Sequence, residues 1–184
     1  MEASRASLRQ EFREVRLGFS KNSGAVVRTA LKSNILRLLV DLTSEGDEIG
    51  AYSPTPEEAQ FSDLPDNNYF FPRIEGEELH FYRPSGPMIK NHLNILEPDS
   101  SSKPMTSGRL ILTPAVAVDS VGNRLGMGGG YYDRFFARHS DCIRVGVVYQ
   151  VQVSRHPLPA ESWDQPLDWI VTENMILRTP RRSS

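Results

Sequence analysis

The stretch Arg124-Leu125-Gly126-Met127-Gly128-Gly129-Gly130-Tyr131-Tyr132-Asp133 determines which fold and which kind of site the sequence predicts. It follows an apolar run at 110–118 that predicts a buried strand, and it precedes 134–138, which predicts a helix. Strand, glycine loop and helix form an anion-binding arrangement, because glycine lets the backbone approach a ligand and the first N–H groups of a helix lack internal partners. Arg124 can add positive charge at the loop entrance.

Neither of two well-known phosphate loops matches this stretch. The dinucleotide fingerprint needs glycine at its first, third and sixth positions directly after a strand. Gly126 and Gly128 fit, but the sixth position is Tyr131, and residues 120–125 separate the predicted strand from the loop. The P-loop needs a Gly-Lys pair, which the chain lacks. The loop is therefore either a phosphate cradle of another kind or a structural turn.

Asp133 bears on this choice, because a carboxylate next to a bound phosphate would repel it. A Mg²⁺ ion that bridges carboxylate and phosphate oxygens would explain the acid. Alternatively, Asp133 complements the helix dipole in the first helical turn. The physical arguments leave both interpretations open.

The motif Arg-Leu-Gly-x-Gly-Gly-Gly-Tyr-Tyr-Asp-Arg at 124–134 resembles the signature of the 5-formyltetrahydrofolate cyclo-ligase (5,10-methenyltetrahydrofolate synthetase) family. The resemblance extends from about Arg5 to Thr172. It implies an enzyme that uses ATP and Mg²⁺ to close 5-formyltetrahydrofolate to the 5,10-methenyl form, with release of ADP and phosphate. The family's phosphoryl transfer to the formyl oxygen needs no protein nucleophile.

Composition and charge narrow the class of protein. The chain has 184 residues, of which 39% are hydrophobic, and a formal net charge of −2. We expect one domain over 1–184 and no general affinity for nucleic acid. Cys142 is the only cysteine, so no intrachain disulfide can form. Without a membrane-spanning apolar run or a signal-peptide pattern, we expect a cytoplasmic monomer with no membrane partner.

Hydrophobic periodicity predicts the fold. It favours helices at 5–19 and 23–42, and strands at 48–52, 109–118, 143–149 and 169–172. A hairpin is expected about residues 75–77. Alternating strands and helices indicate an α/β fold. With the family resemblance, we predict a single-domain three-layer α/β/α sandwich with a mixed, largely parallel central sheet, a basic N-terminal helix at 4–19 and a short basic tail at 180–184.

The first predicted helix carries a stripe of arginines. Arg5, Arg9, Arg13 and Arg16 fall in one arc next to the apolar face. Such a stripe is either a solvated basic face or a source of phosphate ligands. The resemblance places Arg5 and Arg9 on the ATP phosphates, with Arg5 where the family commonly has lysine.

The resemblance also implies a folate side and a metal side of the site. A glutamate that binds the pterin falls at Glu58, with Glu57 as an equal candidate from spacing alone. Asp164 is the expected partner of Asp133 in holding Mg²⁺, with Asp168 as the runner-up, although either could be a turn acid. The other expected folate contacts are Tyr52, Lys90, Leu93, which stands where the family often has an aromatic residue, and Tyr132.

The remaining roles follow from the predicted reaction. The loop glycines would cradle phosphates, with Tyr131 packing beside them or lining the pocket, and Arg124, Tyr132 and Asp133 would act in catalysis. The histidines show no metal-ligand spacing. Two alternatives are a non-catalytic folate- or nucleotide-binding protein of the same fold, and a module whose basic helix binds RNA or acidic proteins. The expected phosphate-binding glycines are Gly126, Gly128, Gly129 and Gly130.

Overall fold

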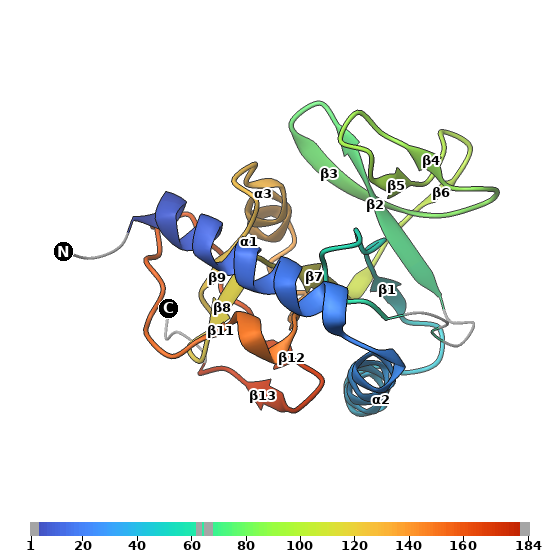
Figure 1. Cartoon of the computed structure of the whole chain (residues 1–184). Coiled ribbons are helices and arrows are strands. Elements are labelled where there is room, and N and C mark those ends of the chain that lie inside the picture. Colours follow the sequence, from blue (N-terminus) through green and yellow to red (C-terminus); the bar gives the residue numbers. More distant parts are fainter. Residues whose placement is uncertain (1–3, 62–63, 65–67, 181–184) are drawn as a thin grey trace.

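The computed structural model describes residues 4–61, 64 and 68–180, and its centre is a large mixed sheet (Figure 1). Among these residues the sheet has eight strands in the order β13-β12-β10-β7-β1-β2-β3-β6. The strands from β12 to β2 pair in parallel, whereas β13, β3 and β6 pair antiparallel to their neighbours. In chain order they are β1 (Glu48–Gly50), β2 (Tyr69–Glu75), β3 (Glu78–Arg83), β6 (Lys103–Pro104), β7 (Gly108–Pro114), β10 (Ile143–Val147), β12 (Trp169–Val171) and β13 (Ile176–Arg178).

Two small sheets accompany the large one. β8 (Ala117–Asp119), β9 (Arg124–Leu125) and β11 (Val153–Ser154) form the first, with β8 in the middle. β4 (Ile89–Lys90) and β5 (Leu96–Glu97) form a short hairpin. Figure 1 draws this hairpin on the arm that contains β2 and β3.

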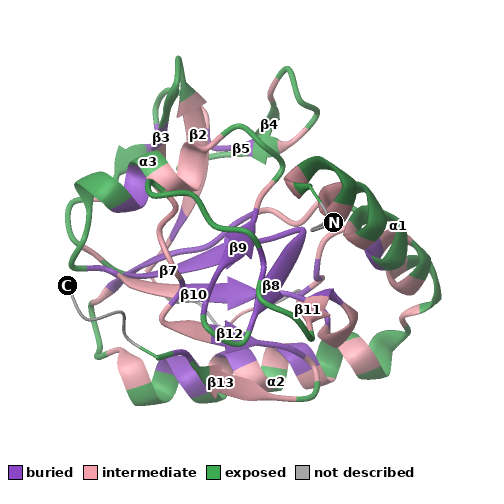
Figure 2. Ribbon diagram, turned by 90° about the vertical axis from the view of Figure 1, so that its left-hand side faces the viewer, coloured by how far each residue is buried: buried purple, intermediate pink, exposed green. Residues whose placement is uncertain are grey.

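Helices α2 (Ala25–Leu42) and α3 (Tyr131–Arg138) cover opposite faces of the sheet. Alternation along β7 determines which core each residue joins, since successive side chains of a strand point to opposite faces. Leu110 and Leu112 join the cluster formed with α2, whereas Ile111 joins the cluster formed with α3. The buried strands between the helices are visible in Figure 2. The predicted three-layer sandwich is therefore confirmed.

Helix α1 (Arg5–Asn22) has a different place from the other two, because it crosses the carboxyl ends of the parallel strands (Figure 1). Leu8 and Phe12 pack against Leu125 and its neighbours, and the Phe19 ring lies 4.9 Å from the ring of Tyr149, which follows β10. The 3₁₀ turn η1 (Gln150–Gln152) also contacts α1. In open α/β sheets this edge is where ligands bind, so α1 lies beside the expected site.

Most predicted elements occur with small shifts of their ends, but the strand predicted at 109–118 is divided. β7 ends at Pro114, which has no N–H to extend the ladder, and the chain then leaves the large sheet to form β8. The antiparallel pair β8–β9 carries the chain back to the glycine loop. Of the predicted basic tail, residues 181–184 lie outside the described residues. No described helix has the length and apolar character that a bilayer crossing needs.

The buried carboxylate of Asp119 fixes the turn between β8 and β9. It accepts hydrogen bonds from the N–H groups of Val121 at 3.1 Å, Asn123 at 2.9 Å and Leu158 at 2.7 Å. The first two bonds close the turn, and the third joins it to a segment far along the chain. Asp119 thereby sets the position of β9, whose first residue is Arg124.

Glu48 joins β1 to the beginning of β7. Its carboxylate accepts hydrogen bonds from the N–H groups of Thr106 and Ser107, both at 2.6 Å, and from the Thr106 hydroxyl at 3.1 Å. Burial alone would raise the pKa of Glu48, but these hydrogen bonds outweigh it and lower the pKa below its usual value. Glu48 is therefore a structural acid at the middle of the sheet.

We expect Glu48→Gln to lower the free energy of unfolding by about 2 kcal/mol at pH 7, because hydrogen bonds to a charged acceptor are the stronger ones. Since the folded-state pKa of Glu48 is depressed, its contribution is present above the unfolded pKa of about 4.3 and is lost as pH falls through the folded pKa. Urea unfolding at several pH values should show the difference shrinking in acid. Glu77→Gln, in an exposed turn, is the matched control.

Candidate active site

The glycine loop presents backbone N–H groups at the start of α3. Gly128 and Gly130 have φ angles of +106° and +66°, which residues with a side chain rarely adopt. Gly130 is the N-cap of α3, and no side chain accepts a hydrogen bond from the first helical turn. The first N–H groups of α3 are thus available to an anion, as the sequence predicts.

Two arginine–carboxylate pairs surround this loop. Nη2 of Arg124 lies 2.7 Å from Oδ1 of Asp133, and the pair spans the loop from β9 to α3. Arg5, in the first turn of α1, forms a bidentate pair with Asp164, in which Nη2 lies 3.2 Å from Oδ1. The structure therefore brings Arg5 and Asp164, from near the two ends of the chain, to the loop that contains Arg124 and Asp133.

Further hydrogen bonds hold the surrounding segments to the loop. Nε of Arg9 donates to the carbonyl of Gly126 at 3.0 Å, which attaches α1 directly to the loop. The N–H of Gln165 donates to Oδ1 of Asp133 at 3.1 Å. The Arg5 and Arg9 predicted as phosphate ligands thus lie at the site, while Arg13 stays exposed further along α1.

The Arg5–Asp164 pair keeps both of its members charged. The hydrogen bond that Arg5 donates to Asp164 raises the pKa of Arg5. Burial alone would raise the pKa of Asp164, but the bonds from Arg5 and from the N–H of Glu161 lower it. Asp164 is therefore a carboxylate at neutral pH, and both of its oxygens accept hydrogen bonds, from Arg5 and from the N–H of Glu161.

Asp133 and Asp164 fit a magnesium ion that is bound together with phosphate. Among the described residues no group of three or more His, Cys, Asp or Glu side chains could hold a metal. Mg²⁺ usually takes one or two carboxylates plus phosphate and water oxygens, so two acids would be enough where phosphate completes the site. Asp168, the runner-up, instead accepts a 2.9 Å hydrogen bond from the N–H of Arg144 between β10 and β12, which is a structural role.

The two candidate pterin acids point to different partners. Glu57 pairs with Nη2 of Arg16 at 3.1 Å. Glu58 accepts a 2.9 Å hydrogen bond from the N–H of Thr55, and burial raises its pKa. Burial, with the nearby Glu58 charge as a second cause, also raises the pKa of Tyr132, so these two expected folate residues lie near each other. The assignment of the pterin to Glu58, with Glu57 as the alternative, stays a prediction.

The other expected folate contacts lie elsewhere. The Tyr52 side chain is in the core, where its hydroxyl donates to the Ala59 carbonyl at 3.0 Å and its ring packs against Phe61. Tyr52 therefore supports the loop that carries Glu58 rather than offering a free surface to a ligand. Lys90 and Leu93 are exposed on the β4–β5 hairpin, which Figure 1 draws away from the beginning of α1. The structure does not bring them to the glycine loop.

A groove of about 520 Å³ runs beside the glycine loop. Its lining consists of one side of α1, including Arg9 and Arg13, together with Glu57 and Met127 of the glycine loop. Because Arg9 also binds the loop carbonyl, the groove adjoins the phosphate site. A substrate longer than a phosphate can therefore extend along α1.

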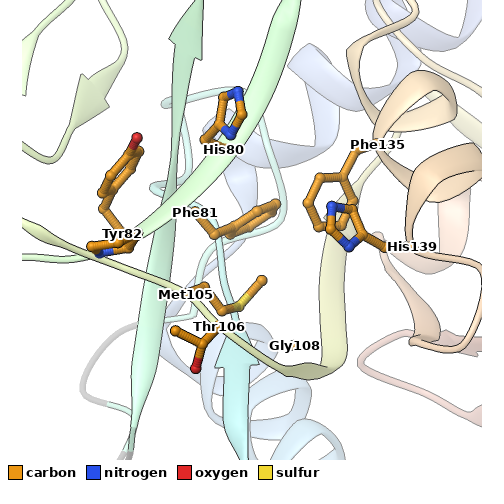
Figure 3. A pocket seen from close by; sticks show the side chains of 9 residues that line it. His80, Phe81, Tyr82, Met105, Thr106, Gly108, Phe135 and His139 are labelled. Carbon is orange, nitrogen blue, oxygen red and sulfur yellow. The ribbon is translucent and has the colours of Figure 1, made fainter.

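A smaller cavity of about 110 Å³ lies between β3, the beginning of β7 and α3 (Figure 3). Phe81, Met105 and Phe135 give it an apolar floor, and His80 and His139 stand at its margin. None of the residues predicted for the active site lines this cavity. Its lining is therefore distinct from the residues around the glycine loop.

Sequence reasoning missed some residues on which the site depends. The pattern Asp-x-x-x-Asn at 119–123 is typical of a side-chain-stabilised turn and could have identified Asp119. Gln165 could not have been found, because it acts through its backbone N–H. Arg16 was grouped with the exposed stripe, but its side chain is 2% exposed. That burial contradicts a basic face made of all four arginines.

Fold and site together define an α/β protein with a candidate anion-binding site at the carboxyl edge of its sheet. Comparison with known proteins agrees: the model of the 5-formyltetrahydrofolate cyclo-ligase family matches residues 1–173. The chain therefore belongs to the 5-formyltetrahydrofolate cyclo-ligase family.

Individual relatives show how far the likeness extends. The chain is 37% identical to the 5-formyltetrahydrofolate cyclo-ligase of Haemophilus influenzae over 56% of this chain and 60% of that protein. The corresponding Escherichia coli K12 enzyme is also 37% identical, over 52% of this chain and 54% of that protein. These alignments thus span less than two thirds of either relative.

Solved structures cover more of the chain. The Aquifex aeolicus 5,10-methenyltetrahydrofolate synthetase superimposes with a TM-score of 0.76 and 28% identity, covering 98% of this chain and 95% of that one. The Mycoplasma pneumoniae synthetase, with a TM-score of 0.71 and 20% identity, supports the fold.

We expect Gly129→Val to weaken phosphate binding strongly while the fold persists. A Cβ at Gly129 would lie 2.7 Å from the Tyr131 ring, so the side chain would displace that ring and obstruct the loop amides. Loss of two charge-assisted hydrogen bonds should weaken binding of tripolyphosphate about 100-fold, measured by calorimetry. Gly18→Ala in α1, where an added Cβ meets nothing, is the control. Loss of the circular dichroism spectrum would instead show that the loop is mainly structural.

Proposed function

We propose that this protein closes 5-formyltetrahydrofolate to 5,10-methenyltetrahydrofolate in a reaction that consumes ATP and Mg²⁺ and releases ADP and phosphate. Family membership supports this proposal. The observation that carries it is the convergence of Arg5, Arg9 and Arg124 with two carboxylates around the uncapped start of α3. Such a set of groups suits phosphoryl transfer, in which the protein positions the phosphates and neutralises their charge.

The reaction has a chemical difficulty that phosphoryl transfer removes. The formyl carbon of an amide is unreactive, and its oxygen is a poor leaving group. Transfer of the γ-phosphoryl to the formyl oxygen activates the carbon for attack by N10, and phosphate then departs. The protein contributes alignment and electrostatic stabilisation rather than a covalent intermediate.

In the proposed site, the phosphate side consists of the glycine loop and the arginines. The loop N–H groups and the start of α3 would donate hydrogen bonds to the phosphates. Arg5, Arg9 and Arg124 would offset their charge. Each guanidinium has five N–H donors, so Arg5 and Arg124 can keep their carboxylate partners while they bind phosphate. Tyr131 packs beside the loop.

The metal would be held by Asp133 and Asp164, and when bound it would neutralise charge on the transferred phosphoryl group. Asp133 also fixes Arg124 and accepts a hydrogen bond from the N–H of Gln165, so it orients the loop whatever ligand is bound.

The folate side would use Glu58, which can accept hydrogen bonds from the pterin, and Tyr132 beside it. Lys90 and Leu93 remain proposed contacts of the folate from the β4–β5 hairpin. We also infer a working monomer, because one chain supplies every element of the site.

The direct test mixes the protein with 5-formyltetrahydrofolate, ATP and Mg²⁺ and follows near-ultraviolet absorbance. Ring closure extends the conjugation of the folate, so the product has a new absorption band. We expect the band to need all three components. A folded protein that binds folate and ATP but gives no band would be a non-catalytic binding protein. Binding of RNA that depends on the α1 arginines but not on Gly129 would support the basic-helix alternative.

We expect Asp133→Asn to lower kcat at least about 100-fold, because it removes a metal ligand and the partner of Arg124. Turnover at increasing Mg²⁺ concentrations measures both the loss and any change in metal dependence. Asp41→Asn, on the exposed side of α2, should leave both unchanged. If Asp133→Asn keeps its activity and its Mg²⁺ dependence, Asp133 has no role in metal binding.

A further inference from the structure

Arg16 is a buried cation that none of the proposed catalytic steps uses. Its side chain is 2% exposed and lies where α1 crosses the carboxyl ends of the strands. Nη2 lies 3.1 Å from Oε2 of Glu57, and Nη1 lies 3.4 Å from the carbonyl of Ala115. Nε has no hydrogen-bond partner among the described residues. Burying a charge with so few partners is costly, so stability alone does not explain the arginine.

The contacts of Arg16 lead to the loop that carries Glu58. Its ion-pair partner is Glu57, the residue directly before Glu58. The other side of the loop is held by the Tyr52 hydroxyl on the Ala59 carbonyl and the Tyr149 hydroxyl on the Glu58 carbonyl, at 3.0 and 3.2 Å. The loop that carries Glu58 is thus held by two tyrosine hydroxyls and by Arg16, and Arg16 is the contact that α1 contributes.

Arg16 also contributes charge at Glu58. The Thr55 N–H donates directly to the Glu58 carboxylate, and the titratable groups that interact with it electrostatically are Glu57, Tyr52, Tyr132 and, from α1, Arg16. Burial raises the pKa of Glu58, and the positive charge of Arg16 opposes that rise. Arg16 lowers the pKa of Glu58 through its charge and without direct contact, because its ion pair is made to Glu57.

We propose that Arg16 is a positioning residue for the folate side of the site, holding Glu57 so that Glu58 faces the substrate and keeping Glu58 as the carboxylate that accepts the pterin N–H groups. This inference rests on the proposed function, since it takes Glu58 as the folate ligand. It gives α1 two roles: its first turns serve the phosphates through Arg5 and Arg9, and its later turn serves the folate through Arg16.

The test replaces Arg16 by methionine, which keeps much of the length without the charge. We expect Arg16→Met to raise KM for 5-formyltetrahydrofolate about tenfold and to leave KM for ATP within about twofold. The rise in KM with falling pH should begin at a higher pH in the variant, because Glu58 then protonates more readily. Arg16→Lys should restore the pH profile, since it keeps the charge. Arg37→Met, on the exposed side of α2, is the control and should change neither constant.

Two further measurements keep the proposal testable where Arg16→Met shows no turnover or does not fold. Carbon-13 NMR of the glutamate carboxyls should show Glu58 titrating at higher pH in Arg16→Met and near its wild-type pH in Arg16→Lys. If Arg16→Met does not fold, Glu57→Gln removes the ion pair at a half-exposed residue and should raise KM for the folate alone. An unchanged Glu58 titration in folded Arg16→Met, or equal rises of both KM values in either variant, overturns the proposal. A wild-type protein without cyclo-ligase activity overturns the proposed function instead, while the NMR titration still decides whether Arg16 controls Glu58.

Discussion

The ion pair between Arg124 and Asp133 is the interaction on which the site depends. It closes the glycine loop, joining the first residue of β9 to the first turn of α3 across a segment whose glycines give the backbone little stiffness of its own. Without such a closure, the loop amides would sample many orientations, and the entropy of ordering them would oppose every binding event. Gln165 donates to the same carboxylate, so the closure also positions the segment that contains Asp164.

Helix α1 connects the closed glycine loop to the core of the protein. Apolar contacts of Leu8 and Phe12 hold the helix on the carboxyl edge of the sheet, and Arg9 attaches it to the loop. The helix can therefore supply charged groups to ligands at that edge while its apolar side belongs to the core. Asp119 also fixes segments that border the site. Its carboxylate accepts hydrogen bonds from the β8–β9 turn and from the N–H of Leu158, and so joins the two. The site is thus formed where α1, the glycine loop and the segment after Leu158 meet, and not by one sequence motif.

The sequence could predict the fold and the loop because both depend on local patterns. Hydrophobic periodicity fixes the helices, and a run of glycines before a helix is visible without a structure. The helical wheel, however, places Arg16 in an arc without saying which neighbouring element covers it, so its burial could not be predicted. Glu57 and Glu58 are equivalent in spacing, and only the tertiary position of Arg16 separates them. Likewise, an apolar residue at a strand end, such as Tyr52, can equally line a pocket or belong to the core.

The balance of charge at the loop bears on how such a site discriminates among ligands. Arg5 and Arg124 are each compensated by a carboxylate, so the phosphate site lacks the strong positive potential that three arginines alone would create. An anion without a metal ion is attracted by the arginines and repelled by the carboxylates, so its net attraction to the site is reduced. A ligand that brings its own cation can satisfy the acids as well as the arginines. Under the proposed function, compensation would favour a metal–nucleotide complex over free phosphate, through the same two carboxylates that hold the loop and α1 in place.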